Sequence, residues 1–355
     1  MRIAIVRTPG APAGCGAALT ASALAAAGHR VRIVTDAPGA PELVAPPDGP
    51  GTLRIDDPAG DMAAAWADEP PEVVHAIGPV AGCAAAATGL PLVVACPVDD
   101  TGMPAGAPAP GAARVLASSE DQHAVLLRAG VPRARLRLVP AGVDTGTFTP
   151  DGPALARRTH PRLVTVGSLA TGAGADAAIR ALARIPAAEL LVGGGAAGDD
   201  PDRARLFAIA REAGVAGRVR FLGPVGHAAL PRLLRSADVV VTAPEHDIPA
   251  GPVLQAMACA RPVVATAVGG LRDAVVDRVT GGHVRPGHPD ELAAAVREIL
   301  TDEALRIGYG VAGRDRAVSR FDVARIAEAL TRIYAEVTGT ADGEPGDREP
   351  VGAAG

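Results

Sequence analysis

Two acidic residues, Glu245 and Asp247, stand between a strongly apolar run and a segment rich in helix-forming residues. The apolar run, residues 239–242, predicts a buried strand, and the segment that opens at Pro252 predicts a helix. The N-terminus of such a helix offers free N–H groups and a partial positive charge that bind phosphate, while either carboxylate can accept hydroxyl protons of a sugar. Capping of the helix by these acids is the simpler alternative.

Two glycine-rich segments also follow predicted strands. Residues 9–17, with Gly14 and Gly16, lie between the first strand and the first helix, where glycine lets the backbone approach a ligand. An ordinary strand-to-helix turn is the alternative, because Leu19 stands where a dinucleotide fingerprint has its third glycine. The run of three glycines at residues 193–195 lacks the acidic partner of a dinucleotide site, so we expect no NAD-dependent oxidoreductase.

His75 ends a short apolar run, residues 73–75, so we expect it at the carboxyl end of a strand with its side chain within reach of a ligand. A hydrogen-bonded core histidine is the alternative. The eight histidines form no cluster with ligand spacing, and no Asp-x-Asp pair stands at a strand end. We therefore expect no bound metal.

Short β-branched runs alternate with Ala- and Leu-rich segments along the chain, which predicts α/β domains with doubly wound parallel sheets. The strands are predicted at residues 3–6, 31–34, 73–75, 92–95, 115–117, 136–139, 163–166, 190–192, 219–222, 239–242 and 263–266. The first helix is predicted at residues 17–27, where Gly28 ends it, and the last two at residues 289–300 and 322–337.

The length of 355 residues favours two domains, and a Pro- and Gly-containing segment near residues 150–161 is the expected boundary. We assign residues 1–150 to the first domain and residues 151–337 to the second, with a last helix that can pack back on the first. Residues 338–355 are rich in Gly, Pro and acids and are expected to be a disordered tail. Residues 97–111 are a candidate wall of the site.

The composition excludes several classes of function. All 34 basic residues are arginine, so no lysine can form a Schiff base, and the net charge is −5 without a basic block. Because there is no basic block, we expect neither nucleic-acid binding nor attraction to an anionic membrane. Aromatic residues, at 2%, are too few for stacking on single-stranded nucleic acid. The four cysteines are widely spaced, and no run of 18 apolar residues occurs. A cytoplasmic protein without an integral membrane segment is expected.

Several separate segments together resemble the retaining family 4 (group 1) glycosyltransferases of the GT-B fold. They are residues 139–144 (VPAGVD) followed by Phe148, residues 256–266 (AMACARPVVAT), and the pair Gly269-Gly270. The resemblance implies two facing Rossmann-like domains, with the nucleotide-sugar donor, UDP- or GDP-linked, held mainly by the second. It further implies sugar transfer to a small soluble acceptor with retention at the anomeric carbon, with no cofactor beyond the donor and no metal.

The same resemblance supplies the residue roles. His75 would line the sugar pocket and Asp247 would hold donor-sugar hydroxyls, as the two catalytic candidates. The donor-binding candidates lie in loops after strands or at the start of the helix after residue 250: Gly14, Gly16, Gly167, Ser168, Gly223, Val225, Glu245, Gly251, Pro252, Val253 and Gln255.

The sequence departs from the family's pattern at the expected diphosphate site. Ser168 and Ala173 stand where the family carries a basic pair, and loss of two charge-assisted bonds weakens binding by about 3–6 kcal/mol. Gln255 replaces the second of the family's paired carboxylates, Ile77 a second histidine, and Ala250 a glycine.

These departures keep a second interpretation open, a non-catalytic GT-B-fold homologue that binds a nucleotide, a sugar or a protein. Under the transferase interpretation, the candidates to replace the missing charges are Arg7, Arg261 and Arg272, because the guanidinium fork binds phosphate well.

Overall fold

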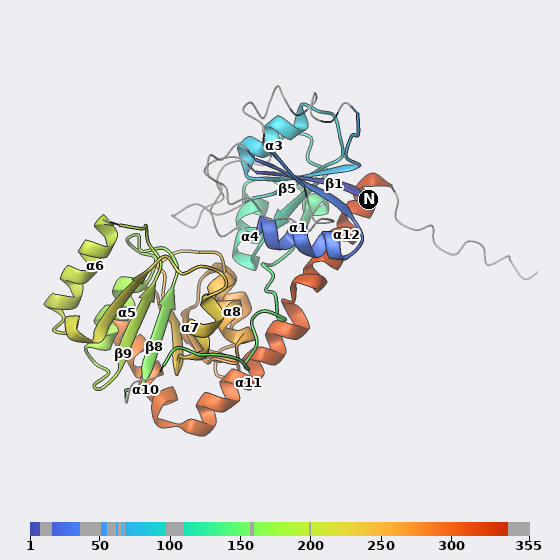
Figure 1. Cartoon of the computed structure of the whole chain (residues 1–355). Coiled ribbons are helices and arrows are strands. Elements are labelled where there is room, and N and C mark those ends of the chain that lie inside the picture. The colour runs from blue at the N-terminus through green and yellow to red at the C-terminus, as the bar shows by residue number, and fades with distance from the viewer. Residues whose placement is uncertain are drawn as a thin grey trace, which may run out of the picture.

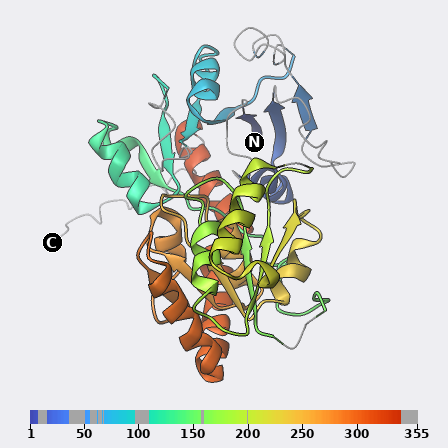
Figure 2. The ribbon, with the colours of Figure 1, turned by 90° about the vertical axis from the view of Figure 1, so that its left-hand side faces the viewer.

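The computed structural model describes residues 1–7, 16–35, 51–54, 62, 66, 68–96, 109–156, 160–198 and 200–339. Within these ranges the chain forms two parallel β-sheets in two domains, which lie one above the other in Figures 1 and 2. The prediction of two doubly wound α/β domains is confirmed.

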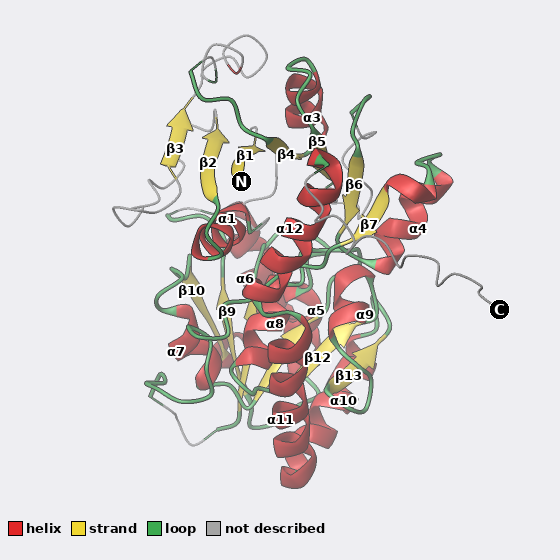
Figure 3. Ribbon diagram, turned by 90° about the vertical axis from the view of Figure 1, so that its right-hand side faces the viewer, coloured by secondary structure: helices red, strands yellow, loops and turns green. Residues whose placement is uncertain are grey.

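The first sheet has seven strands in the order β3-β2-β1-β4-β5-β6-β7, and Figure 3 shows them in this order. The strands are β1 (Arg2–Arg7), β2 (Arg30–Thr35), β3 (Gly51–Arg54), β4 (Val73–Ile77), β5 (Leu92–Ala95), β6 (Arg114–Ala117) and β7 (Leu136–Leu138). Its helices are α1 (Ala17–Ala26), α3 (Pro79–Ala86) and α4 (Glu120–Arg128), and the 3-10 turn η1 is Arg133–Arg135.

The second sheet has six strands in the order β10-β9-β8-β11-β12-β13. The strands are β8 (Arg162–Val166), β9 (Glu189–Gly193), β10 (Val219–Gly223), β11 (Val239–Thr242), β12 (Val263–Thr266) and β13 (Gly281–Val284). The helices are α5 (Ala175–Leu182), α6 (Pro201–Glu212), α7 (Leu230–Arg235), α8 (Gly251–Ala258), α9 (Gly269–Ala274), α10 (Pro289–Thr301) and α11 (Glu303–Arg320), with the 3-10 turn η2 at Ala216–Arg218.

Each sheet is buried on both faces, as a parallel sheet covered by helices must be. Along β1, Ala4 and Val6 belong to one hydrophobic cluster and Ile3 and Ile5 to another on the opposite face, because successive side chains of a strand point to opposite sides. The second sheet is likewise covered by two clusters. This double burial explains why the strands read as continuous apolar runs.

The chain passes between the domains twice, and the two crossings run side by side. Val143 forms an isolated parallel bridge with Asp322, supported by hydrogen bonds from Val143 N to Phe321 O and from Val323 N to Val143 O. Val143 and Phe148, just before the expected boundary at residues 150–161, pack in the core of the second domain.

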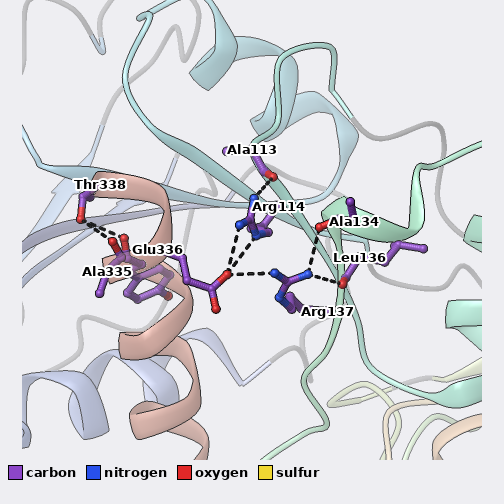
Figure 4. Close-up of polar contacts among 9 residues, drawn as sticks. Ala113, Arg114, Ala134, Leu136, Arg137, Ala335, Glu336 and Thr338 are labelled. Atoms are coloured by element: carbon purple, nitrogen blue, oxygen red, sulfur yellow. Dashed lines mark hydrogen bonds and ion pairs between the residues drawn. The ribbon is translucent and has the colours of Figure 1, made fainter. Parts of the chain in front are cut away.

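After the second crossing, α12 (Val323–Thr338) packs on the first domain beside α1. Figures 1 and 3 show α11 and α12 following one another along the molecule from the second domain to the first. The end of α12 is fixed by Glu336, whose carboxylate contacts Arg114 of β6 at 3.1 Å and Arg137 of β7 at 2.9 Å (Figure 4). These arginines hold the pKa of Glu336 below its usual range against the effect of its burial.

The sequence analysis did not predict β3, β13, α9 or α11. Strand β13 reads Gly-Gly-His-Val and lacks the β-branched run that marks a strand, and α11 contains three glycines, which lower helix propensity. Both β13 and α11 form because neighbouring elements pack against them. The proposed tail beyond residue 339 and most of the loop at residues 97–111 lie outside the described residues. No helix in the described part of the chain is long and apolar enough to cross a membrane.

Candidate functional site

A glycine stands at or just after the carboxyl end of three neighbouring strands of the second sheet. Gly167 follows β8, Gly193 ends β9 and Gly223 ends β10, and backbone bonds from Gly167 N to Gly193 O and from Gly194 N to Gly223 O extend the sheet beyond its strands. A Cβ on Gly194 would lie 1.9 Å from the carbonyl oxygen of Gly167, and φ there is +138°. Only glycine fits this close approach, which leaves a backbone edge without side chains.

We call Gly167, Gly193, Gly194 and Gly223, at the carboxyl ends of β8, β9 and β10, the glycine edge. Of these residues, the sequence analysis selected Gly167 and Gly223 but not Gly194. The signal was present in the run of three glycines, which was weighed only as a dinucleotide fingerprint. Val225, another candidate, lies over the same edge: a Cβ on Gly193 would be 2.9 Å from Val225 Cγ2.

The loop after β11 brings the acidic candidates to the same edge. Glu245 is exposed, and its N–H donates to the carbonyl of Gly172 in the loop after β8 at 2.8 Å. Helix α8 then begins at Gly251 with Pro252 in its first turn, and no side chain caps it. Its first N–H groups are therefore available to an anion. Val253 is buried in the core and cannot contact a ligand through its side chain, whereas Gln255 is half-buried.

Asp247 occupies the most constrained position in this loop. Its Oδ1 accepts the N–H of Gly270 at 3.0 Å, and its Oδ2 accepts the hydroxyl of Ser119 from the first domain at 3.1 Å. Burial raises the pKa of Asp247 and the carboxylates of Asp121 and Asp273 raise it further, while these two hydrogen bonds lower it. Neither contact makes Asp247 a helix cap of α8, which was the simpler alternative.

The carboxyl-edge loops of the two sheets meet at Asp247. Helix α4 follows β6 of the first sheet and α9 follows β12 of the second, and each helix start binds an aspartate of the other. Gly269 N donates to Asp121 Oδ2 at 2.9 Å, and Glu120 N donates to Asp273 Oδ2 at 2.8 Å. The guanidinium of Arg272 adds an ion pair to Asp121 at 2.8 Å. The sequence analysis missed this contact apart from Asp247 and Arg272.

His75 lies in the first domain, away from these contacts. The expectation that it ends its strand is wrong, since β4 continues to Ile77 and His75 is buried in its middle. Its Nδ1 lies 2.7 Å from the hydroxyl of Tyr334 on α12. Burial lowers the pKa of His75 to about 4, so the ring is neutral at physiological pH. This is the geometry of a hydrogen-bonded core histidine.

The remaining candidates of the first domain lie near the start of α1. Gly16 precedes α1, is exposed and has φ +65°, a conformation that favours glycine. Gly14 lies outside the described residues. Arg7 is the last residue of β1 and therefore stands at the carboxyl edge of the first sheet, next to Ile77 in register.

Of the proposed replacement arginines, one lies at the opposite edge of the sheet and another is engaged in a contact between the domains. Arg261 precedes β12 and lines a surface pocket with Asp238 and Arg306 at the amino ends of the strands, the edge opposite to the glycines. Arg272 is paired with Asp121. A different arginine, Arg205 of α6, reaches the loop of the missing basic pair.

The guanidinium of Arg205 donates to the carbonyl of Leu169 at 2.6 Å, pairs with Asp202 of the same helix at 3.3 Å and is partly exposed. Leu169 follows Ser168, whose exposed hydroxyl accepts the N–H of Ala170 at 3.2 Å. Ala173 contributes only its backbone, with N–H donated to Ala170 O at 3.1 Å. The arrangement thus offers backbone N–H groups, one nearby guanidinium and one carboxylate, a set suited to phosphate and to sugar hydroxyls.

Comparison with known protein families gives two matches that together span most of the chain. Residues 17–147 match the model "Glycosyltransferase Family 4", and residues 153–316 match the model "Glycosyl transferases group 1".

Named relatives match in part. A D-inositol 3-phosphate glycosyltransferase of Xylanimonas cellulosilytica is 35% identical over 239 residues, which cover 63% of this chain and 57% of the relative. One of Mycolicibacterium gilvum is 36% identical over 225 residues, covering 61% of this chain and 49% of the relative. The matched region therefore spans about half the length of these relatives.

Solved structures resemble the whole chain. A sucrose-phosphate synthase from Thermosynechococcus elongatus has a TM-score of 0.81 at 24% identity, covering 96% of this chain and all of that one. HepE of Anabaena, solved in complex with UDP and glucose, has a TM-score of 0.79 at 20% identity and covers 95% of this chain. These likenesses show a shared fold.

Proposed function

Because the chain belongs to the group 1, family 4 glycosyltransferases, we propose that it transfers a sugar from a nucleoside-diphosphate sugar to a small hydroxylic acceptor. The observation that carries the proposal is the glycine edge of the second sheet beside Asp247 and the uncapped start of α8. The uncapped N–H groups at the start of α8 suit the diphosphate, the glycines let it approach the backbone, and the carboxylate suits the sugar hydroxyls. HepE, which shares the fold, binds UDP and glucose.

In the proposed reaction, the bond between the anomeric carbon and the diphosphate oxygen breaks, and its electron pair leaves with the nucleoside diphosphate. The acceptor oxygen bonds to the anomeric carbon on the same face, so the configuration is retained, and the acceptor proton passes to the departing phosphate. The protein contributes preorganised hydrogen-bond donors where negative charge develops.

The departing diphosphate is the group that most needs positive charge nearby, because negative charge builds up on it as the bond to the sugar breaks. We assign this task to the α8 N-terminus and to Arg205, whose guanidinium is held 2.6 Å from Leu169 O beside Ser168. Arg205→Gln should therefore weaken UDP binding, while Arg203→Gln, an exposed change in the first turn of the same helix, should leave it unchanged.

The proposal extends to the acceptor, the metal requirement and the cellular location. The matched relatives are named for D-inositol 3-phosphate, which makes a small polyol phosphate the first acceptor to try. We propose that the reaction needs no bound metal ion. We also propose a cytoplasmic location, in keeping with the wide spacing of the four cysteines in the sequence. Unchanged activity in EDTA would support metal independence.

Calorimetric titration of the purified chain with UDP, GDP, ADP and TDP tests the donor site first. Micromolar binding of one nucleotide would identify the donor class, after which the matching nucleotide sugar and a polyol phosphate are assayed for release of nucleoside diphosphate. Asp247→Asn should abolish release, while Asp315→Asn, an exposed change on α11, should not. Absence of binding to all four at millimolar concentration would refute the proposal and favour the non-catalytic alternative.

A further inference from the structure

Hydrogen bonds and an ion pair join the two domains around Asp247. We define the α4–α9 clasp as Ser119, Glu120 and Asp121 from the first domain and Asp247, Gly269, Arg272 and Asp273 from the second. The clasp is reciprocal, because Asp121 binds the start of α9 and Asp273 binds the start of α4. The clasp therefore joins the two domains directly.

Ser119 connects this clasp to the proposed donor site. Its side chain is fully buried, accepts the N–H of Gln122 at 3.1 Å as the cap of α4, and donates its hydroxyl proton to Asp247 Oδ2 at 3.1 Å. A serine hydroxyl has one proton to donate, and here that proton faces the carboxylate. The carboxylate of the second domain is therefore oriented by a residue of the first.

The first domain holds Ser119 rigidly. The buried side chain of Gln122 accepts hydrogen bonds from the N–H and the hydroxyl of Ser118 and donates its amide to the carbonyl of Cys96, just after β5. These bonds fix the start of α4 to the end of β5. Ser119 thus presents its hydroxyl from a preorganised backbone and not from a mobile loop.

The second domain leaves room for Asp247 on the other side. A Cβ on Gly269 would lie 1.8 Å from the carboxylate of Asp247, so a side chain there would displace it. The N–H of Gly270 binds the remaining oxygen at 3.0 Å. Each carboxylate oxygen therefore accepts one protein hydrogen bond and keeps a second lone pair for a ligand hydroxyl.

We propose that Ser119 is a positioning residue for Asp247 and that the α4–α9 clasp holds the two domains together at the donor-sugar site. This inference rests on the proposed transferase function. It predicts that loss of the Ser119 hydroxyl affects ligands that carry the sugar and spares the nucleotide alone. One hydrogen bond to a charged group corresponds to a change of about tenfold to a hundredfold.

Ser119→Gly is the main variant, because glycine is accepted at a helix start and removes the hydroxyl with little loss of α4 stability. Calorimetry should show weaker binding of the nucleotide sugar, by about tenfold or more, with the affinity for UDP unchanged, and kcat should fall in parallel. Ser119→Thr keeps a hydroxyl and should restore both. Asp302→Ala, which removes the cap of α11 outside the clasp, controls for loss of a cap alone.

A second measurement tests the clasp without activity. The double variant Asp121→Ala/Asp273→Ala should increase the radius of gyration in small-angle X-ray scattering, while Asp315→Ala should not. Equal loss of UDP and nucleotide-sugar affinity in Ser119→Gly, or full activity of that variant, would overturn the proposal for Ser119. An unchanged radius in the double variant would overturn the clasp. Failure of the wild-type chain to bind any nucleotide would instead refute the proposed function.

Discussion

His75 is buried in its uncharged form, so the first domain should become less stable as the pH falls. The imidazole titrates near 6.5 in an unfolded chain, and burial lowers its pKa to about 4 in the folded protein. The unfolded state therefore binds the proton more tightly. The stabilisation is fully present above about pH 6.5 and is lost as the pH falls toward 4. Between pH 7 and pH 5, these two pKa values correspond to a loss of about 2 kcal/mol in the free energy of unfolding.

The chain contains one tryptophan, Trp66, which is buried in the core of the first domain together with Ala76, the neighbour of His75. Urea unfolding followed by Trp66 fluorescence thus reports the domain in question. His75→Gln removes the titration and keeps an amide that can bond to the Tyr334 hydroxyl, so its stability should fall by about 2 kcal/mol less than that of the wild type over the same pH range.

The comparison between variants cancels the contribution of the other titrating groups. His288→Gln, an exposed change just before α10, should follow the wild type and controls for loss of an imidazole as such. An equal pH dependence in His75→Gln and wild type, within about 0.5 kcal/mol, would show that His75 is charged or solvated in the folded state and would refute this reasoning.

Other predictions concern buried charge, the glycine edge and the anchor of α12. Arg162→Met leaves the buried carboxylate of Glu189 unpaired and should destabilise the second domain by about 3–5 kcal/mol in urea unfolding followed by circular dichroism, whereas addition of Glu189→Leu should restore most of it. Gly194→Ala should abolish UDP binding in calorimetry, while Gly198→Ala, which also has positive φ but open space, should retain it. Glu336→Gln should lower stability by about 1 kcal/mol in urea at low salt and by less at high salt, because its arginine pairs are partly exposed; a salt-independent loss would contradict this.

The local pattern of the sequence predicted nearly all strands within a residue or two. The strands of a doubly covered parallel sheet are apolar on both faces, so they stand out between Ala-rich helices. The exceptions have the opposite character: β13 begins with two glycines and α11 contains three, and both form because neighbouring elements pack against them. Propensity is a weak guide where tertiary contacts supply the stability.

The sequence also identified the loop after β11 and two of the edge glycines, since a glycine at a strand end and an acid before a helix are local signals. It placed His75 at the end of its strand, but the apolar run continues through Ala76 and Ile77 and His75 lies in the middle. It also suggested Arg261, which lies on the opposite edge. Whether a strand residue reaches a ligand depends on strand length and sheet edge, which the residue type does not reveal.

The sequence by itself therefore determined the two-domain α/β architecture and the family, because these depend on periodicity and on short motifs. Only the tertiary structure decided how the site is assembled. Ser119 and Asp247 are 128 residues apart along the chain, and their hydrogen bond exists because two separate sheets place their carboxyl edges together. The signal for Ser119 in the sequence is that of a helix cap, and its partner is set by the packing of the domains.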